Sequence, residues 1–474
     1  MLRILLSLLV AVLATAAFAE KKKNPAPKSY IYRYYLRDKQ GCGFSTDHPA
    51  RFLSAKAIER RKRQRLKVDE SDLPVSSRYL KEFCIEGTEV LGTSRWNNTV
   101  IVRSRDTLQL RHLAQLPCVV EARMVWQSPD SVEAEGDVKW NVREQFQRWD
   151  SVPNDPYGMS RPQIESLGGN RLHEIGLRGE GITIAVLDGG FMNANRIPCL
   201  RQLRLKGIHN FVAPPIGSRL SSAEAENDGI YDGIDHGTKV LSVLAADAPE
   251  VIQGTAIEAS YWLLRCEDPE TEQPVEEDYW AMAAEFADSV GADIISSSLG
   301  YNEYDLGLGS YRLQDLNGQT ALISRTASML ARKGMVHCNS AGNSGMNSWK
   351  KIGVPADAHD ILTVGALDQQ GRIAAFSSVG PSQDLRVKPD IVAQGAPTTL
   401  VSGRGLLARD MGTSFSTPLI AGLVACLWQG LPGKTALEIM ELVRRSATLC
   451  DEPDNIYGYG RPDFWHAYMI SQSE

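Results

Sequence analysis

From Tyr157 onward, short apolar segments alternate with longer segments whose apolar residues recur at helical spacing. The apolar segments have the length of β-strands, and the segments between them have the length of helices. Such alternation predicts an α/β fold in which helices cover both faces of a parallel sheet. The expected strands are residues 182–187, 293–297, 335–339 and 361–365, and the expected helices lie near residues 238–246, 278–290, 320–333 and 416–428.

The segment before this domain has a different order of elements. Its strand-like and helix-like stretches follow one another as β-α-β-β-α-β, the order of the split βαβ, ferredoxin-like pattern. We therefore expect a small α+β unit over residues 29–126. Its expected strands are residues 29–37, 90–96, 98–103 and 118–126, and its expected helices are residues 50–65 and 106–116. Residues 128–156 are polar and show little apolar periodicity, which is typical of a linker.

The N-terminus has the pattern of a secretory signal peptide. Arg3 precedes an apolar stretch over residues 4–14, and Ala17-Phe18-Ala19 supplies the small residues of a cleavage site. An uncleaved N-terminal helix is the alternative. Glu20 stands where a lipoprotein would carry cysteine. No later segment reaches the roughly 18 apolar residues of a membrane span, so we expect an exported protein, periplasmic or extracellular, without a span after signal removal.

The net charge and the number and spacing of cysteines argue against two classes of function, nucleic-acid binding and metal binding by cysteine. A net charge of −6 lacks the basic surplus of nucleic-acid-binding proteins, so we expect no nucleic-acid partner. The eight cysteines are few for this length and their spacing resembles no metal site, while their pairing stays open. A basic run over residues 59–65 is a local exception. We interpret it as the solvated face of a helix, with nucleic-acid contact or dibasic processing as alternatives.

Three residues could take part in the same reaction, and each of them stands at a turn beside an apolar element. Asp188 follows a predicted strand and precedes two glycines. His236 opens a predicted helix, and Ser414 lies between Gly412 and an apolar helical run. Alone, each has a structural interpretation, as a carboxylate in a turn, a structural histidine or a helix cap. Together they supply the hydroxyl, imidazole and carboxylate that nucleophilic catalysis needs.

A fourth candidate follows the strand predicted at residues 335–339. Asn343 ends the sequence Ser340-Ala341-Gly342-Asn343. Its side-chain amide can donate a hydrogen bond to a developing oxyanion, together with the backbone N–H of Ser414. Taken in isolation, an asparagine at this position is an ordinary turn residue. Its place beside three other candidates favours the catalytic interpretation.

These motifs, in the chain order Asp, His, Ser, resemble those of the subtilisin-like serine peptidases over nearly all of residues 157–469. The matches are Val-Leu-Asp-Gly-Gly around Asp188, His-Gly-Thr at His236 and Gly-Thr-Ser-Phe-Ser-Thr-Pro around Ser414. Ser-Ala-Gly-Asn, ending at Asn343, matches the family's oxyanion position. The resemblance further implies substrate-binding roles for Ser298, Leu299, Gly300, Ser340, Ala341 and Gly342, the first three as an edge segment that pairs with the substrate backbone.

The resemblance implies a secreted serine endopeptidase that acts on protein or peptide substrates and is made as a zymogen. Residues 20–127 would then be a pro-domain that assists folding and inhibits the enzyme intramolecularly until it is cut away between Gln127 and Asp155. A permanent substrate-binding module is the alternative. The expected division is a signal peptide (1–19), a pro-domain (20–127), a linker with the maturation site (128–156), a peptidase domain (157–469) and a tail (470–474).

We expect no required cofactor and no metal at the catalytic residues. Residues 246–250 form a short loop without the asparagine-rich calcium loop of many relatives, so calcium is not predicted there and is left open elsewhere. Residues 267–272 and 276–278 are strongly acidic. They either border subsites and favour basic substrates, or form an ordinary solvated loop and helix start. Residues 301–319 resemble an insertion beside the pocket, which shapes substrate access or merely extends a surface loop.

Two rival functions belong to other classes. An esterase could use the same nucleophile, but the chain lacks the Gly-x-Ser-x-Gly elbow of α/β-hydrolases. A catalytically silent binding protein could retain the scaffold, yet candidates for all four catalytic roles are intact. Because His236 must be neutral to act as a base, we expect activity to fall below about pH 6–7.

Overall fold

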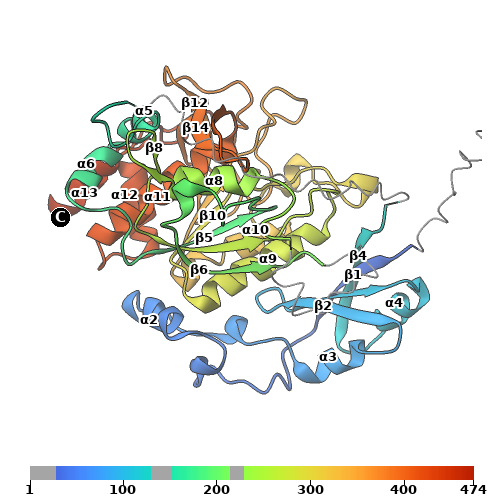
Figure 1. Cartoon of the computed structure of the whole chain (residues 1–474). Helices are drawn as coiled ribbons and strands as arrows, with labels where there is room; N and C mark the ends of the chain where they lie inside the picture. Colours follow the sequence, from blue (N-terminus) through green and yellow to red (C-terminus); the bar gives the residue numbers. More distant parts are fainter. Residues whose placement is uncertain (1–27, 130–151, 214–228, 474) are drawn as a thin grey trace, which may run out of the picture.

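The computed structural model describes residues 28–129, 152–213 and 229–473. A sheet of seven parallel strands forms the centre of the larger domain (Figure 1), and this confirms the predicted α/β class. From edge to edge the strands are β13 (Ile391–Ala396), β12 (Leu362–Asp368), β11 (Val336–Ser340), β10 (Ile294–Ser297), β5 (Thr183–Asp188), β9 (Ser260–Arg265) and β6 (Arg204–Asn210).

The four strands expected from sequence are β5, β10, β11 and β12, and the structure confirms them with shifts of one to three residues at their ends. The sequence pattern missed β6, β9 and β13. Strand β6 lies at the sheet edge and carries exposed Arg204 and Lys206, so it lacks the continuous apolar run of a central strand. The order of strands brings β5 and β10 to the middle of the sheet, where both faces are covered.

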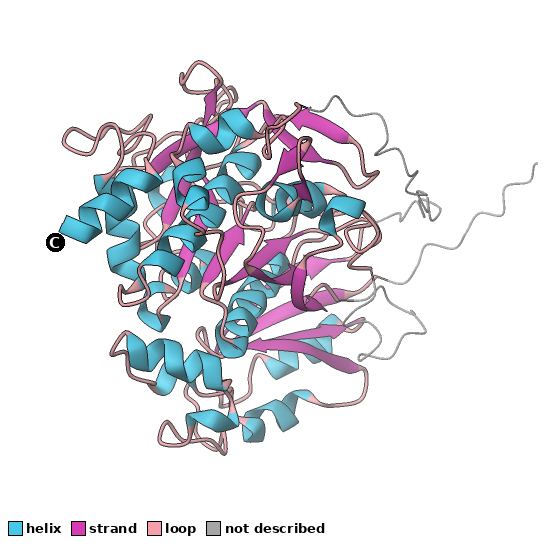
Figure 2. Ribbon diagram, turned by 60° about the vertical axis from the view of Figure 1, so that its left-hand side comes forward, coloured by secondary structure: helices cyan, strands magenta, loops and turns pink. Residues whose placement is uncertain are grey.

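Helices pack on both faces of this sheet (Figure 2). Along β5, Ile184 and Val186 belong to one apolar cluster, whereas Ala185 and Leu187 belong to the other. This alternation follows from the two-residue period of a strand. One face is covered by α8 (His236–Ala245), α11 (Thr413–Gly430), α12 (Ala436–Arg445) and α13 (Phe464–Ser473), together with the short helix α6 (Gly169–Glu174), on which α5 (Arg161–Glu165) packs. The other face is covered by α9 (Val275–Val290) and α10 (Leu322–Ala327).

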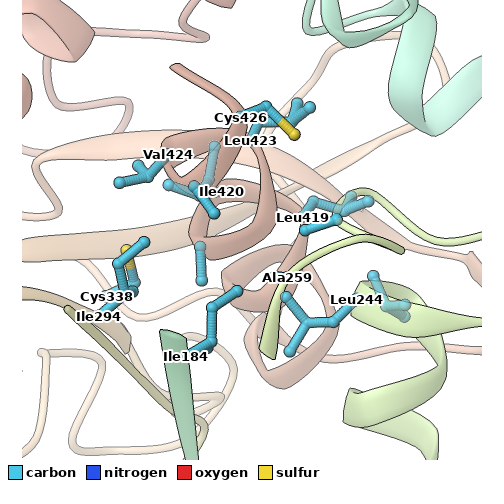
Figure 3. Packing of buried hydrophobic residues seen from close by; sticks show 14 of the residues in the cluster. Ile184, Leu244, Ala259, Ile294, Cys338, Leu419, Ile420, Leu423, Val424 and Cys426 are labelled. Atoms are coloured by element: carbon cyan, nitrogen blue, oxygen red, sulfur yellow. The ribbon is translucent and has the colours of Figure 1, made fainter. Parts of the chain in front are cut away.

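Helix α11 lies at the centre of its layer and is apolar on every side. Leu419, Ile420 and Leu423 pack against side chains of the sheet and of α8 (Figure 3). A β-carbon at Gly422 would overlap the side chain of Thr255, so only glycine permits this close approach. The dense packing fixes the N-terminal end of α11, where Ser414 lies.

The smaller unit contains a four-stranded antiparallel sheet in the order β2-β3-β1-β4, formed by Thr88–Ser94, Thr99–Ser104, Tyr30–Leu36 and Val119–Gln127 respectively. This strand order agrees with the ferredoxin-like pattern expected from sequence. Its three α-helices among the described residues are α2 (Ala55–Arg63), α3 (Ser77–Phe83) and α4 (Thr107–Leu113).

The helices of the small unit differ from the expectation in one respect. Helix α3, which the sequence pattern missed, supplies Phe83 to the core of the small sheet, and α4 supplies Leu110 and Leu113. Helix α2 lies instead away from that sheet and packs against α9 of the large domain (Figure 1). The first helix of the expected pattern is therefore a docking element, and α3 takes its place on the sheet.

The basic run on α2 is a solvated face only in part, because Lys62, Arg63 and Arg65 are exposed whereas two of its arginines are buried. Arg60 and Arg61 are 2% and 1% exposed, and both pair with Asp288 of α9. Other ion pairs across this boundary join Arg33 to Asp278, Lys56 to Asp293 and Arg95 to Asp288. An apolar cluster also crosses it, because Ile31 and Trp96 pack with the buried side chains of α9.

The eight cysteines are all unpaired, so the structure contains no disulfide among them. Within residues 28–129, 152–213 and 229–473, no helix is long and apolar enough to cross a membrane. The predicted signal peptide, residues 1–19, lies outside the described residues, as do residues 130–151 of the predicted linker.

Candidate active site

The candidate residues gather where the central strands end. Asp188 is the last residue of β5, and Ser298 directly follows β10. His236 is the first residue of α8, and Ser414 is the second residue of α11. The carboxyl ends of parallel strands and the N-terminal ends of the helices lie at the same edge of an α/β sheet, which is where such folds bind their ligands.

Asp188 and His236 form a hydrogen-bonded pair. The Nδ1 atom of His236 lies 2.9 and 3.0 Å from the two carboxylate oxygens of Asp188. An ionised carboxylate only accepts hydrogen bonds, so Nδ1 carries the proton and donates it. The neutral ring therefore has its lone pair on Nε2, the nitrogen that a general base uses. Asp188 is fully buried, and Oδ1 also accepts from the backbone N–H of Gly189 at 2.8 Å.

The environment of His236 raises its basicity. Burial lowers the pKa of the imidazole, but the charge and hydrogen bond of Asp188 outweigh burial, and Glu267 adds to them, so the pKa rises to about 9. The side chain is 32% exposed, which leaves one side of the ring accessible from solvent. The other side faces Phe415, the residue after Ser414, at a ring-centroid distance of 5.9 Å.

Ser414 is held by contacts between α11 and the segment after β10. Its carbonyl accepts a 2.8 Å hydrogen bond from Ser298 Oγ, and its own hydroxyl donates to the Ser298 carbonyl at 3.4 Å. The second bond is long and therefore weak. Among the described residues, Ser298 and not His236 is the hydrogen-bond partner of the Ser414 hydroxyl.

Asn343 follows β11 and faces the start of α11. Its Oδ1 accepts from the backbone N–H and from the hydroxyl of Thr413, at 3.0 and 2.9 Å. Both partners are donors, so they fix which end of the amide is the oxygen and leave Nδ2 available as a donor. A β-carbon built on Gly412 would lie 3.7 Å from Nδ2, which shows that the nitrogen is directed at the turn before Ser414.

The segments expected to bind substrate border these residues. Ser298, Leu299, Ser340 and Ala341 are buried, whereas Gly300 is exposed and Gly342 is half-buried. Among the described residues the backbone N–H and C=O of Gly300 have no hydrogen-bond partner, although Tyr301 next to it pairs with Val354. An unpaired backbone at a strand end can accept an additional extended chain.

The sequence matches the model described as "Subtilase family" over residues 179–460, which is more than half of the chain. The chain belongs to the subtilase family. Residues 31–140 match a second model, described as "Peptidase S8 propeptide domain, Bacteroidota". The subtilase is thus a serine-type endopeptidase with a propeptide domain, and the small sheet unit belongs to that propeptide domain.

Curated relatives of this subtilase are proteases from bacteria. Subtilisin NAT of Bacillus subtilis subsp. natto is 26% identical over 309 residues, which cover 65% of this chain and 68% of the relative. Serine protease AprX of Bacillus subtilis (strain 168) is 27% identical over 321 residues, covering 60% and 65%. M-protease of Shouchella clausii (strain KSM-K16) is 24% identical over 368 residues, covering 77% and 83%.

Sequence reasoning missed one residue beside the hydrogen-bonded pair of Asp188 and His236. Glu267 lies two residues beyond β9, and a β-carbon on Gly189 would lie 2.7 Å from its Oε2 atom. Its pKa rises to about 8, chiefly through burial and then through the charge of Asp188. The acidic segment had been singled out from sequence, but nothing local indicates that it folds back beside Asp188, 79 positions earlier in the chain.

The acidic start of α9 is also not an ordinary solvated helix end. Glu276, Glu277 and Asp278 are all buried. Glu277 accepts hydrogen bonds from the hydroxyls of Tyr304 and Tyr311 at 3.0 and 2.6 Å. The segment predicted as an insertion, residues 301–319, is therefore anchored on the first turn of α9 rather than being a free surface loop.

Proposed function

We propose that this subtilase hydrolyses peptide bonds through an acyl-enzyme on Ser414. His236 takes the proton from Ser414 Oγ as the oxygen attacks the carbonyl carbon, and then delivers it to the leaving amine. Asp188 holds the imidazole in the required tautomer and stabilises its charged form. Water then attacks the ester, with His236 again as the base. The hydrogen-bonded pair of Asp188 and His236, beside the N-terminal end of α11, is the observation that carries this proposal.

The developing oxyanion would accept hydrogen bonds from Asn343 Nδ2 and from the backbone N–H of Ser414. The amide nitrogen of Asn343 is available because Thr413 occupies its oxygen. The N–H of Ser414 lies in the first turn of α11, where backbone donors have no partner within the helix. The positive end of the helix dipole adds to the stabilisation of negative charge there.

The propeptide domain would act as the intramolecular inhibitor of the same site. The end of β4 supports this role, because the backbone N–H and C=O of Gln127 bond to the side-chain amide of Gln273, at 2.9 and 3.1 Å. Gln273 precedes α9 and follows the acidic segment beside the catalytic pair. The chain that continues from Gln127 thus starts close to the candidate substrate site, where it can be both inhibitor and first substrate.

A fluorophosphonate probe tests the assignment of the nucleophile. The active enzyme should be labelled on Ser414, digest casein, and lose both properties when Ser414 is replaced by Ala. A Ser414→Ala variant that digests casein at the native rate would disprove the mechanism. Labelling with ester hydrolysis but without casein digestion would indicate an esterase instead.

Maturation and export need a separate experiment. Expression in a host with a secretion pathway should yield a shortened wild-type product whose N-terminus lies between Gln127 and Asp155. The Ser414→Ala variant should keep its propeptide but still lose residues 1–19, since signal removal is carried out by another enzyme. Sequencing of both N-termini and separation of cell fractions distinguish the two cleavages. Retention of the propeptide in the active wild-type enzyme would favour a permanent binding module.

A further inference from the structure

Three carboxylates converge next to the pair of Asp188 and His236, and within the part of the chain that the structure describes none of the three forms an ion pair with a lysine or arginine. Glu267 comes from the segment after β9, Glu272 from the loop before α9, and Glu276 from the first turn of α9. One carboxylate oxygen of each residue lies within 4.8 Å of those of the other two. Like charges at this separation repel strongly unless a positive charge lies between them.

Two buried groups at the same place have no hydrogen-bond partner. Glu276 is 0% exposed, and neither of its carboxylate oxygens has a partner in acceptable geometry. The hydroxyl of Tyr301, a residue that is 1% exposed, is likewise unpartnered. Among charged groups, Glu276 acts most strongly on this hydroxyl, and the hydroxyl in turn acts on the Glu276 carboxylate, so the two groups lie close to each other. Buried polar groups normally find partners, so these orphaned atoms indicate a missing ligand.

We propose that Glu267, Glu272 and Glu276 bind a calcium ion. Calcium takes six to eight oxygen ligands at about 2.3–2.6 Å, so ligands on opposite sides of the ion are up to about 5 Å apart. Oxygens that lie within 4.8 Å of one another can therefore all contact one ion. The fully buried carboxylate of Glu276 would supply both oxygens, and water would complete the shell on the half-buried side formed by Glu267 and Glu272.

The pKa values of the three carboxylates agree with a cation site. Burial, followed by mutual repulsion and nearby acidic charges, raises the pKa of Glu267 to about 8, of Glu272 to about 7 and of Glu276 to about 10. A divalent cation favours the ionised form of each carboxylate. The site lies apart from residues 246–250, where sequence predicted no calcium, and the ion has no part in the proposed acyl transfer.

A lysine or arginine side chain of a substrate is the competing occupant, because the cluster lies beside the catalytic pair. A single positive charge would leave two of the three carboxylate charges uncompensated. A divalent ion compensates two, and carboxylate oxygens are ligands that calcium prefers. The number of charges and the kinds of ligand therefore favour calcium.

Calorimetric titration of the full chain tests the site. Ser414→Ala serves as the background, since it should keep the chain intact, and bound metal is first removed with EDTA. We expect one Ca²⁺ per chain, bound more tightly than Mg²⁺, and a rise in the melting temperature on calcium addition. Glu276→Gln should weaken Ca²⁺ binding by roughly tenfold or more, because a charged ligand is lost. Glu270→Gln is the matched control, an exposed acidic residue outside the cluster, and should bind Ca²⁺ unchanged.

Glu272→Gln keeps the test decisive if Glu276→Gln folds poorly, because Glu272 is only half-buried. It should also lower calcium affinity, with an unchanged circular dichroism spectrum. Absence of saturable binding up to about 1 mM Ca²⁺, the weak end of known protein sites, would overturn the proposal. Equal affinity in both variants and the control would overturn it as well. A third result would assign the cluster to substrate instead: an arginine-containing peptide binds, Ca²⁺ does not displace it, and Glu272→Gln abolishes its binding.

Discussion

In the proposed mechanism, the imidazole of His236 sets the pH range in which this subtilase works. Only the neutral ring can accept the proton of Ser414, and Asp188 raises the pKa of that ring to about 9 against the opposing effect of burial. We therefore expect kcat/KM to rise up to about pH 9 and to fall about tenfold per pH unit below it. The sequence alone predicts that activity falls only below about pH 6–7, because it does not show how far Asp188 raises the pKa of His236. Measurement of kcat/KM with an uncharged peptide substrate checks this, and a flat profile between about pH 7 and 9 would contradict it.

Asp188→Asn tests how the Asp188 carboxylate affects the tautomer and the pKa of His236. The amide can hold the ring in the wrong tautomer and no longer stabilises its charged form, so turnover should fall by about 10⁴. The residual activity should have its midpoint at lower pH, because burial then acts without the opposing carboxylate. Asp235→Asn is the control, since Asp235 precedes His236 but pairs with Lys239. Equal losses in both variants would show that the effect is structural.

Asn343 offers a second test at the scale of single residues. Asn343→Ala removes one donor to the oxyanion and should lower kcat by a factor of about 10² to 10³, with little change in KM. The fold should persist because the side chain is exposed. Asn347→Ala, a nearby exposed asparagine, should retain native kcat. A kcat loss below about tenfold in Asn343→Ala would exclude the proposed role.

At the scale of elements, the sequence predicted the central strands and failed at the boundary between the two units. Strands β5 and β10 to β12 are recognisable because burial on both faces makes their sequences continuously apolar. The sequence did not predict the burial of Arg60 and Arg61 on α2, because their partner, Asp288, lies 228 positions away from Arg60. Likewise, the sequence supplied all four catalytic candidates, but not Glu267, whose nearness to Asp188 arises only from the path of the chain after β9.

Asp288 of α9 holds α2 through three arginines, Arg60, Arg61 and Arg95. Asp288→Asn removes the carboxylate charge that compensates Arg60 and Arg95, while Arg61 keeps its ion pair with Asp72, and should destabilise the docking of α2 by about 3–5 kcal/mol. Hydrogen exchange of residues 55–63 in the Ser414→Ala chain should accelerate correspondingly. Arg63→Gln is the control on the same helix, because Arg63 is partly exposed and its contact with Asp293 is 3.8 Å long; it should cost less than about 1 kcal/mol.

Acid should weaken the same boundary. The three arginines outweigh burial and hold the pKa of Asp288 below its usual value. A carboxylate with a depressed pKa contributes stability that is complete above its unfolded pKa, about 4, and is lost as the pH falls through the folded value. Exchange at residues 55–63 should therefore increase only below about pH 4, and the Asp288→Asn variant should lose this dependence. An onset near neutral pH in the parent chain would point to another group.

At the scale of the whole molecule, the propeptide and the peptidase domain share an apolar core. Trp96 packs in the hairpin between β2 and β3 and belongs to the same cluster as Trp280 of α9. Ile31, Ile101 and Val125 join it from the small sheet. A cluster that crosses the boundary couples the stability of the two units, in addition to the ion pairs around Asp288.

This coupling makes a prediction about unfolding of the uncleaved chain. Trp96→Ala in the Ser414→Ala background removes a large side chain that is 8% exposed, and should lower the unfolding free energy by about 3–5 kcal/mol. Because the cavity opens against α9, the loss of stability should appear in the unfolding transition of the peptidase domain. Urea titration and hydrogen exchange of residues 275–290 measure this transition. Leu108→Ala, on the outer face of α4 and 70% exposed, should change stability by less than about 0.5 kcal/mol. The contrary result is that Trp96→Ala makes the small unit unfold at lower urea concentration while the peptidase domain keeps its original midpoint. The two units would then have separate cores that are merely in contact, and the propeptide would stabilise only itself.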